Sequence, residues 1–198
     1  AGAHAGPAGP DPRPPPGAGD GGLGRQTSPA DVTRLAELAD VAARTFPLAC
    51  PPAATTEDIA AFIAENLTAA HFADYVADPG RDVLTATDDG RIVGYAMMIR
   101  GVPDNDDVAR AVTARPAVEL SKMYVLPDAH GSGVSAALMS AALDGATAQG
   151  AASVWLGVNQ HNDRAQRFYA KHGFAITGTK TFRLGNHIEQ DYVMVRPA

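Results

Sequence analysis

The sequence is poor in cysteine and has no long apolar run. Cys50 is the only cysteine in 198 residues, so neither an intrachain disulfide nor a cysteine-based zinc cluster can form. No apolar segment approaches the roughly 20 residues that a membrane-spanning helix needs. The N-terminus also lacks the basic start and apolar stretch of a secretory signal. We therefore expect a cytoplasmic protein with no membrane partner.

Positive charge is also scarce. Lys and Arg number 16 against 22 Asp and Glu, whereas binding to nucleic acid needs clustered Lys and Arg. The charges of residues 1–29 cancel, so the excess of acid lies in residues 30–198 and favours small cationic partners. The six histidines show no metal-ligand spacing, and we expect no metal site and no nucleic-acid partner.

The composition predicts one folded domain behind an irregular tail. Residues 1–29 are dominated by Gly, Pro and Ala, and Leu23 is their only large aliphatic residue. Such a segment cannot bury enough apolar area to offset the entropy lost on ordering, so we predict disorder for residues 1–29. Residues 30–198 have a length that suits a single domain with a sizeable core.

Hydrophobic periodicity predicts an α/β chain. Apolar residues recur at helical spacing over about 30–45, 55–67 and 70–77, with Thr55 or Thr56 as a cap. The period then changes, and residues 82–101 are typical of two strands joined at Asp-Asp-Gly. A polar loop at 103–116, a strand at 117–125, a helix near 133–149 and a strand at 152–158 follow. A short helix from Asn162 to Gly173 and a hairpin around a Gly-Asn turn complete the prediction.

The turn at residues 130–135 reads His-Gly-Ser-Gly-Val-Ser. A helix N-terminus offers unpaired N–H groups and a partial positive charge, and glycines let a phosphate approach the backbone. Two common phosphate motifs are absent, because no lysine accompanies the turn and Ala136 replaces the third glycine of the dinucleotide fingerprint. By itself the turn fits a plain strand-to-helix connection as well as a phosphate site.

Two motifs together resemble the GNAT superfamily of acetyl-CoA-dependent N-acetyltransferases. The family's turn reads Gln/Arg-x-x-Gly-x-Gly/Ala, which this chain matches at Gly133 but not at His130 and Ser135. The family's later helix reads Asn-x-x-Ala-x-x-Phe-Tyr-x-x-x-Gly-Phe. This chain matches it at Asn162, Ala165, Phe168, Tyr169, Gly173 and Phe174. The C-terminal stretch looks closest to bacterial polyamine-type acetyltransferases.

The resemblance implies a fold and a cofactor site. The fold is a mixed, mostly antiparallel twisted sheet of six or seven strands flanked by helices, with a central β-α-β unit that binds acetyl-CoA. Backbone N–H groups of the turn would hold the CoA pyrophosphate, the strand edge at Met123 and Val125 would bond the pantetheine arm, and Asn162 would reach its amides. The residues so assigned to acetyl-CoA are Met123, Val125, His130, Gly131, Ser132, Gly133, Val134, Ser135, Asn162 and Phe168.

The implied reaction is the attack of a neutral amine on a thioester, which needs a base for the amine proton and an acid for the departing thiolate. Tyr169 matches the family tyrosine that often acts as the acid. Glu119 lies on the strand where the family often places a carboxylate base, with a structural role as its alternative. Many relatives carry the base two residues later, where this chain has Ser121, so a water chain through Ser121 is the substitute.

The expected acceptor is a primary amine of a small, polyamine-like molecule. It would lie between the N-terminal helices, residues 103–116 and the last hairpin. Two alternatives stay open: a domain that binds acetyl-CoA as a sensor without efficient catalysis, and an enzyme that acetylates a protein lysine or N-terminus. Many GNATs pair through their C-terminal strands, so the resemblance also raises a homodimer. The acids expected to favour a cationic acceptor are Glu65, Asp74, Asp104, Asp106 and Asp107.

Overall fold

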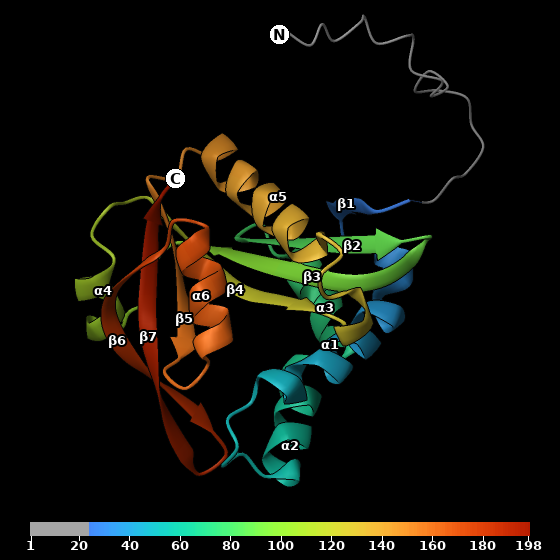
Figure 1. Cartoon of the computed structure of the whole chain (residues 1–198), viewed down its shortest axis with the longest axis horizontal. Coiled ribbons are helices and arrows are strands. Elements are labelled where there is room, and N and C mark those ends of the chain that lie inside the picture. Colours follow the sequence, from blue (N-terminus) through green and yellow to red (C-terminus); the bar gives the residue numbers. More distant parts are fainter. Residues whose placement is uncertain (1–23) are drawn as a thin grey trace, which may run out of the picture.

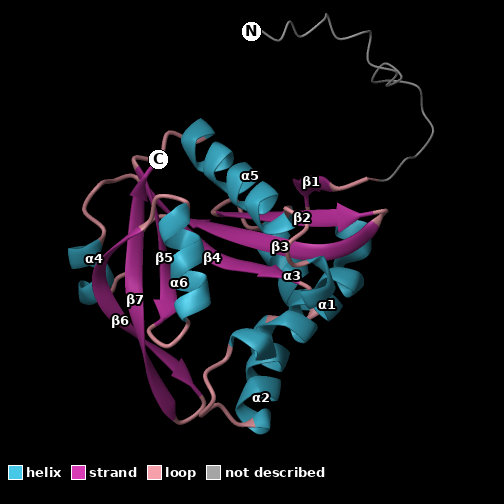
Figure 2. Cartoon of the chain, viewed as in Figure 1, coloured by secondary structure: helices cyan, strands magenta, loops and turns pink. Residues whose placement is uncertain are grey.

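The computed structural model describes residues 24–198, which form a seven-stranded sheet with helices on both faces (Figures 1 and 2). The strands are β1 (Gln26–Pro29), β2 (Arg81–Asp88), β3 (Arg91–Arg100), β4 (Ala117–Val125), β5 (Ser153–Asn159), β6 (Ala175–Leu184) and β7 (His187–Pro197). The α-helices are α1 (Leu35–Ala49), α2 (Thr56–Asn66), α3 (Ala69–Ala77), α4 (Asp106–Ala111), α5 (Val134–Ala148) and α6 (Asp163–Lys171). Two 3-10 helices, η1 (Val32–Arg34) and η2 (Pro127–Ala129), precede α1 and the glycine turn.

The sheet is mixed, and all but one of its strand pairs are antiparallel. Its order is β1-β2-β3-β4-β5-β7-β6, with β4 and β5 as the parallel pair. Helices α5 and α6 lie in front of the sheet in Figure 1, and α1 and α3 lie behind it. The predicted α/β class, the strand-helix-strand centre and the number of strands are therefore confirmed.

Both predicted hairpins are present, and their turns have the backbone that the sequence requires. Asp89 and Gly90 join β2 to β3 with φ values of 48° and 80°, the left-handed pair typical of an Asp-Gly hairpin turn. Gly185, with φ 61°, lies in the turn between β6 and β7. Thr55 caps α2 by accepting from the Asp58 N–H, and Asn162 caps α6 by accepting from the Ala165 N–H.

Three predicted boundaries are corrected by the structure. Residues 26–29, placed by composition in the tail, form β1 and pair with Leu84–Thr87 of β2; an edge strand needs only backbone partners. The prediction for residues 1–23 lies outside the described residues. Helix α1 begins at residue 35 rather than 30, after η1, whose cap is Asp31. The predicted loop at 103–116 contains α4, which is capped by Asn105 and buries Val108 and Ala111.

The divergence of β4 and β5 opens the middle of the sheet. These strands pair only at Ala117–Glu119 with Ser153–Trp155, and no pairing follows toward the end of β4. Trp155 is buried at this junction and donates from Nε1 to the Gly101 carbonyl at 3.3 Å, as expected of a packed strand residue. Beyond residue 119, no strand of the described residues 24–198 pairs with this edge of β4, and Figure 1 shows β4 and β5 running apart.

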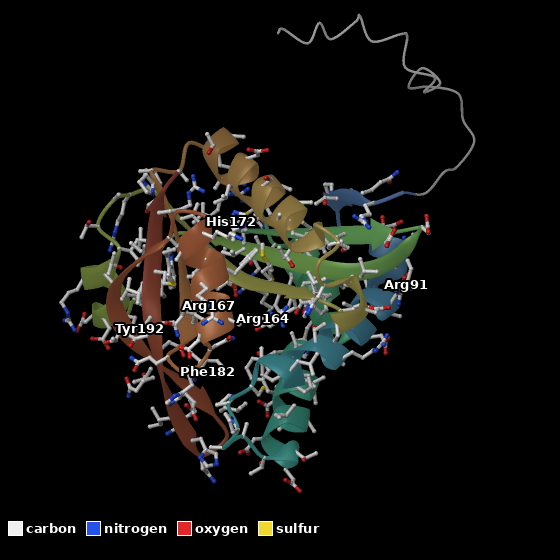
Figure 3. All side chains as sticks on the ribbon, in the orientation of Figure 1. Arg91, Arg164, Arg167, His172, Phe182 and Tyr192 are labelled. Carbon is white, nitrogen blue, oxygen red and sulfur yellow. The ribbon has the colours of Figure 1, made fainter. Side chains whose placement is uncertain are left out.

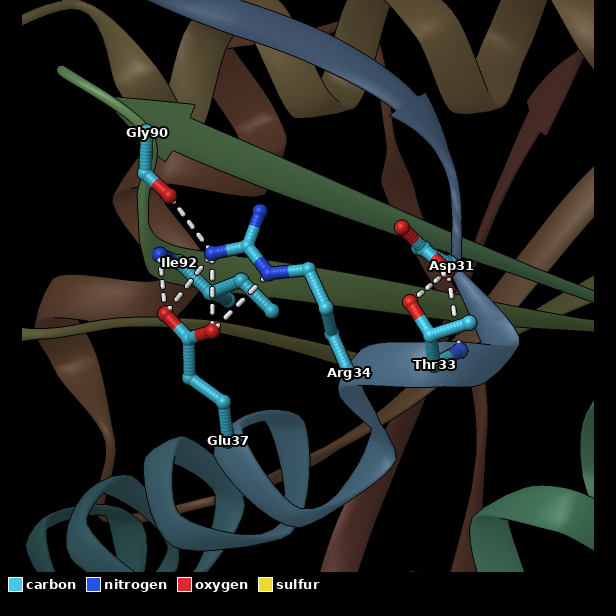
Figure 4. A network of polar contacts seen from close by, with 6 residues as sticks. All are labelled: Asp31, Thr33, Arg34, Glu37, Gly90 and Ile92. Atoms are coloured by element: carbon cyan, nitrogen blue, oxygen red, sulfur yellow. Dashed lines mark hydrogen bonds and ion pairs between the residues drawn. The ribbon is translucent and has the colours of Figure 1, made fainter.

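An ion pair between Arg34 and Glu37, at the start of α1, forms hydrogen bonds with the β2–β3 hairpin (Figure 4). The Arg34 guanidinium donates to the Glu37 carboxylate at 2.7–2.9 Å and to the Gly90 carbonyl at 2.5 Å. The same carboxylate accepts from the Ile92 N–H at 2.9 Å. Partial burial opposes ionisation of Glu37, but the Ile92 N–H and Arg34 outweigh it and lower the Glu37 pKa.

We expect Glu37→Gln to lower the free energy of unfolding by about 1 kcal/mol at pH 7, because the ion pair is partly exposed. Because folding lowers the Glu37 pKa, the carboxylate stabilises the folded state at pH values above its pKa in the unfolded chain, near 4.5. This contribution is lost as the pH falls through the pKa of Glu37 in the folded protein. The difference between wild type and variant, measured by urea unfolding, should therefore shrink below about pH 4. Glu65→Gln, on the exposed side of α2, is the matched control; an equal loss there would contradict this assignment.

Candidate functional site: a cleft at the diverging strands

A cleft of about 680 Å³ lies where β4 and β5 separate. It has two halves that meet at β4. The turn half is formed by the end of β4, the glycine turn, the start of α5 and one side of α6. The acceptor half is formed by the end of α1, the middle of β4, and β5, β6 and β7; among the residues that line it are Phe46, Cys50, Glu119, Lys122, Gly157, Lys180, Phe182 and Asp191.

The turn half presents the N-terminus of α5. Gly131 and Gly133 have φ values of 77° and 85°, and a Cβ atom at either position would meet no atom within 4 Å, so the backbone conformation rather than lack of space favours glycine at both. Gly133 is the N-cap of α5, and the first N–H groups of the helix have no carbonyl partner within it. The 15-residue helix thus directs partial positive charge into the cleft.

Two arginines, Arg25 and Arg164, lie beside this turn, and no sequence motif indicated either of them. The His130 Nε2 atom lies 3.0 Å from the Val125 carbonyl, and Arg164 of α6 donates to His130 Nδ1 at 3.3 Å. Because an arginine only donates, this geometry fits a neutral His130 whose Nε2–H bonds Val125. Arg25 donates to the Ser132 carbonyl. Two arginines thus supply the fixed charge that His130, in place of Gln or Arg, lacks.

The free edge of β4 offers backbone donors to the cleft. The Leu126 N–H donates to the Val93 carbonyl of β3 at 2.8 Å. Because successive residues of a strand bond on opposite sides, the N–H groups of Met123 and Val125 face away from β3, toward the gap left by β5. The cleft therefore has a short row of backbone donors and acceptors of the kind that an extended amide chain can pair with.

A β-bulge brings Glu119 and Lys122 to the same face of β4. Met98 pairs with Leu120 and Met97 with Lys122, so Ser121 is the extra residue, and the face presented by the strand shifts there. Glu119 and Lys122, three residues apart, would otherwise point to opposite faces. Burial raises the Glu119 pKa despite the nearby lysines, and burial lowers the Lys122 pKa.

A buried ion pair forms the floor of the acceptor half. Lys180 Nζ lies 3.4 Å from Asp191 Oδ2, and their side chains are only 18% and 11% exposed. Lys180 extends from β6 across β7 to β5, where Gly157 makes room for it: a Cβ on Gly157 would lie 2.3 Å from Lys180 Cε. Burial raises the Asp191 pKa, and Lys180 opposes that change. No sequence motif indicated this pair, because its partners lie on different strands.

Tyr169 lies on α6 at the boundary between the two halves. Burial raises the pKa of Tyr169 to about 12, so its hydroxyl, like that of an ordinary tyrosine, is protonated at neutral pH. Burial also raises the pKa of Tyr124, the tyrosine on β4. Cys50 lines the cleft too, but burial raises its pKa to about 11, so it is a thiol rather than a nucleophilic thiolate.

The structure brings most of the predicted site residues together. The three predicted catalytic residues, Glu119, Ser121 and Tyr169, line the cleft. So do eight of the ten assigned to acetyl-CoA: Met123, Val125, His130, Gly131, Gly133, Ser135, Asn162 and Phe168.

The other two residues assigned to acetyl-CoA, Ser132 and Val134, lie in the turn and at the start of α5 but are not among the residues that line the cleft. The Ser132 N–H and hydroxyl both bond the Ala129 carbonyl, and the Val134 side chain is buried in the core. The role of their backbone N–H groups in binding acetyl-CoA stays a prediction. The Asn162 side-chain oxygen is engaged as the α6 cap, so only its amide nitrogen remains free to donate into the cleft.

The structure does not place the expected acidic residues, or the segment 103–116, at the cleft. None of the carboxylates at 65, 74, 104, 106 and 107 lines the cleft, and residues 103–116 contribute nothing to it. Helix α4 packs instead against β6 and β7, with Val108 and Ala111 beside Trp155 in a separate apolar cluster. Among residues 24–198, no three His, Cys, Asp or Glu side chains gather where they could hold a metal ion. No helix in that range is long and apolar enough to cross a membrane.

Comparison with known proteins identifies the family. The model of the acetyltransferase (GNAT) family matches residues 37–174. An uncharacterized N-acetyltransferase of Mycobacterium tuberculosis is 61% identical over 165 residues, which cover 83% of this chain and 98% of that protein. The PaiA N-acetyltransferase of Thermoplasma acidophilum, solved with coenzyme A, has a TM-score of 0.69 at 17% identity over 88% of this chain and 99% of its own. The ribosomal-protein-S18-alanine N-acetyltransferase of Escherichia coli has a TM-score of 0.62 at 19% identity over 87% and 93%.

These matches establish the class of protein. The chain belongs to the GNAT family, because the family model covers more than half of it and the mycobacterial relative matches along nearly its whole length. It is an N-acetyltransferase with the GNAT fold, and acetyl-CoA is its acetyl donor. The cleft fits that donor, since a helix N-terminus, Arg164 and an open strand edge line one side of it, and Arg25 bonds the carbonyl of Ser132 in the adjoining turn.

We expect Gly133→Glu to weaken acetyl-CoA binding by about tenfold or more, because a carboxylate and a strained backbone would replace the donors of the turn. Calorimetric titration of acetyl-CoA into wild type and variant measures this. Gly150→Glu is the matched control: Gly150 has φ 78° at the far end of α5, also with no atom near its Cβ position. Equal loss of affinity in both variants would show that folding, not the turn, is responsible.

Proposed function

We propose that the protein transfers an acetyl group from acetyl-CoA directly to the primary amine of a small molecule, with donor and acceptor bound together. The observation that carries this proposal is that three features line one cleft: the open edge of β4, the partly buried carboxyl of Glu119 and the hydroxyl-bearing side chain of Tyr169.

The turn half would hold the acetyl donor. The α5 N-terminus, Arg164 and Arg25 are placed to bind its phosphates, and the N–H groups of Met123 and Val125 are placed to bind its amide chain and acetyl oxygen. Bound acetyl-CoA supplies a thioester carbonyl. Backbone donors preorganised beside that oxygen stabilise the negative charge that develops when an amine adds to it.

Glu119 and Tyr169 would divide the proton transfers. The amine must lose a proton as its nitrogen bonds to the acetyl carbon, and Glu119 accepts it directly or through water held at Ser121. The C–S bond breaks in the same transfer, and Tyr169 donates its hydroxyl proton to the departing thiolate. A carboxylate with a raised pKa is a stronger base than an ordinary one, whereas burial makes the Tyr169 hydroxyl a weaker acid than an ordinary tyrosine, so it would donate only as charge develops on the sulfur.

The walls of the acceptor half favour a small molecule over a protein segment. The tip of the β6–β7 hairpin closes against the first turn of α2: a Cβ on Gly185 would lie 2.1 Å from Asp58 Oδ1, and His187 Nε2 lies 3.9 Å from Asp58 Oδ2. Phe182 packs edge-on against Phe62 of α2, with centroids 5.9 Å apart. The contact between hairpin and helix restricts the room for an extended peptide.

Two expectations from the sequence, the cytoplasmic location and the homodimer, stay predictions.

We expect Glu119→Gln to lower kcat by about 10²-fold or more, because the amide cannot accept the amine proton. In the wild type, kcat/KM should rise with pH through the raised Glu119 pKa, above its ordinary value of 4.5, since only the carboxylate is a base. The pH profile of the variant should lack that limb, while its acetyl-CoA affinity is unchanged. Normal turnover in Glu119→Gln together with a loss in Ser121→Ala would assign the base to a water chain instead.

We expect Tyr169→Phe to lower kcat by about 10²-fold with little effect on acetyl-CoA affinity, because only the acid for the thiolate is lost. Tyr192→Phe is the matched control; Figure 3 shows Tyr192 over β6 and β7, away from Arg164 on α6, and it does not line the cleft. Single-turnover rates measured with excess enzyme separate chemistry from product release. Tight acetyl-CoA binding by the wild type without turnover of any amine or peptide would favour a sensor.

A further inference from the structure

The acceptor half of the cleft is unusually rich in lysine for this chain. The sequence holds only three lysines, and two of them, Lys122 and Lys180, line the cleft. An ammonium group loses favourable hydration when it is buried, so a buried lysine is normally paired with an anion. The two lysines therefore need partners, and the described residues supply one for Lys180 alone.

Lys180 is satisfied within the protein, whereas Lys122 is not. Lys180 pairs with Asp191 at 3.4 Å. Between residues 24 and 198, no side chain or backbone group forms an ion pair or hydrogen bond with Lys122 Nζ, which lies 5.7 Å from the centre of the Phe62 ring. Two charged residues influence the protonation of Lys122: the negative charge of Glu119 raises the Lys122 pKa, and the positive charge of Arg81 lowers it. The arrangement leaves room for one anion from outside.

The bulge at Ser121 places that vacant cation beside the proposed base. Glu119 and Lys122 share one face of β4, so a molecule bound there would meet a carboxylate and an ammonium side by side. A plain diamine could satisfy the first group but would be repelled by the second. A molecule with an amine and a carboxylate on one carbon satisfies both.

Aromatic and aliphatic side chains form a large part of the other walls of the acceptor half. Phe46 and Phe62 stack with centroids 4.4 Å apart, and Phe46, Leu48, Phe182 and Leu184 line the cleft. Asp191 is occupied by Lys180, so no second free carboxylate is available for a polycation. These walls suit an apolar side chain rather than another charged group.

We propose that the acceptor is a free α-amino acid with an apolar side chain, whose carboxylate is bound by Lys122 while its amine faces Glu119. The inference rests on the proposed acetyl transfer and replaces the polyamine-like acceptor expected from the sequence. Lys180, positioned by Gly157 and Asp191, adds a second positive charge behind the same region.

Matched pairs of acceptors test this proposal. Leucine is compared with 3-methylbutylamine and phenylalanine with 2-phenylethylamine, because each pair differs only by the carboxylate; putrescine serves as a polyamine. For each acceptor, kcat/KM is measured from CoA release in wild type, Lys122→Met and Lys171→Met. Lys171, at the end of α6, is exposed and lies outside the cleft. The two acceptors of a pair differ in amine basicity, but this difference is the same for every enzyme variant. A change between variants in the ratio of kcat/KM for the amino acid to kcat/KM for its matched amine therefore reports the contribution of the substituted lysine.

We expect wild type and Lys171→Met to prefer each amino acid over its matched amine by about tenfold or more, as one charge-assisted contact provides. In Lys122→Met the preference should collapse toward one, with acetyl-CoA affinity retained. Equal or better use of the matched amines or putrescine by the wild type would overturn the amino-acid acceptor and leave the acetyl transfer intact. An equal loss for both members of a pair in Lys122→Met would also overturn it, because Lys122 would then act only through Glu119.

Binding measurements separate failure of this inference from failure of the proposed function. Leucine and 3-methylbutylamine are titrated into the CoA-loaded wild type and Lys122→Met. Binding of leucine that depends on Lys122, without turnover of any acceptor, would support the carboxylate site and contradict the acetyl transfer to small amines. Absence of both turnover and leucine binding would overturn both proposals.

Discussion

The site depends on the limited pairing between β4 and β5. These parallel strands share three residue pairs, and the cleft begins where the pairing stops. Were the pairing to continue, the donors of Met123 and Val125 would bond β5, and the sheet would close the cleft that Glu119, Lys122 and Tyr169 line. The buried Trp155, with its bond to Gly101, lies at the last point of contact between the strands. An open strand edge is normally a hazard for aggregation, and here it faces a cleft rather than the outside of the sheet.

The two halves of the cleft differ in how they carry charge. Around the turn, the helix N-terminus, Arg25 and Arg164 all favour an anion, and no carboxylate lines that half. In the acceptor half, Lys180 is paired with Asp191, whereas no ion-pair partner for Lys122 is found among residues 24–198. The first arrangement suits the phosphates of a large cosubstrate. The second suits a smaller molecule that carries both charges, and a polycation is a poor match for it.

Much of the fold could be predicted because its signals are local. The hairpin at Asp89–Gly90, the caps at Thr55 and Asn162 and the helix-forming periodicity each depend on residues within a few positions of one another. The errors arose where tertiary contacts override weak local signals. Strand β1 is held by backbone bonds to β2 despite its poor apolar content, and α4 is stabilised by packing against β6 and β7 within a polar segment. The turn half was predicted by resemblance, since its glycines and the Asn162–Phe174 motif are contiguous in sequence.

The sequence by itself determined the class of the protein, and it also led to the turn that we propose for acetyl-CoA and to the role that we propose for Tyr169, because all three depend on short contiguous motifs. Only the tertiary structure decided the character of the acceptor half. The Ser121 bulge turns Glu119 and Lys122 to one face, and Gly157 admits Lys180 from two strands away. The acids counted from the sequence lie outside the cleft. Composition records how many charges a chain has, but which of them share a cavity depends on register and strand order, and these form only when distant segments pair.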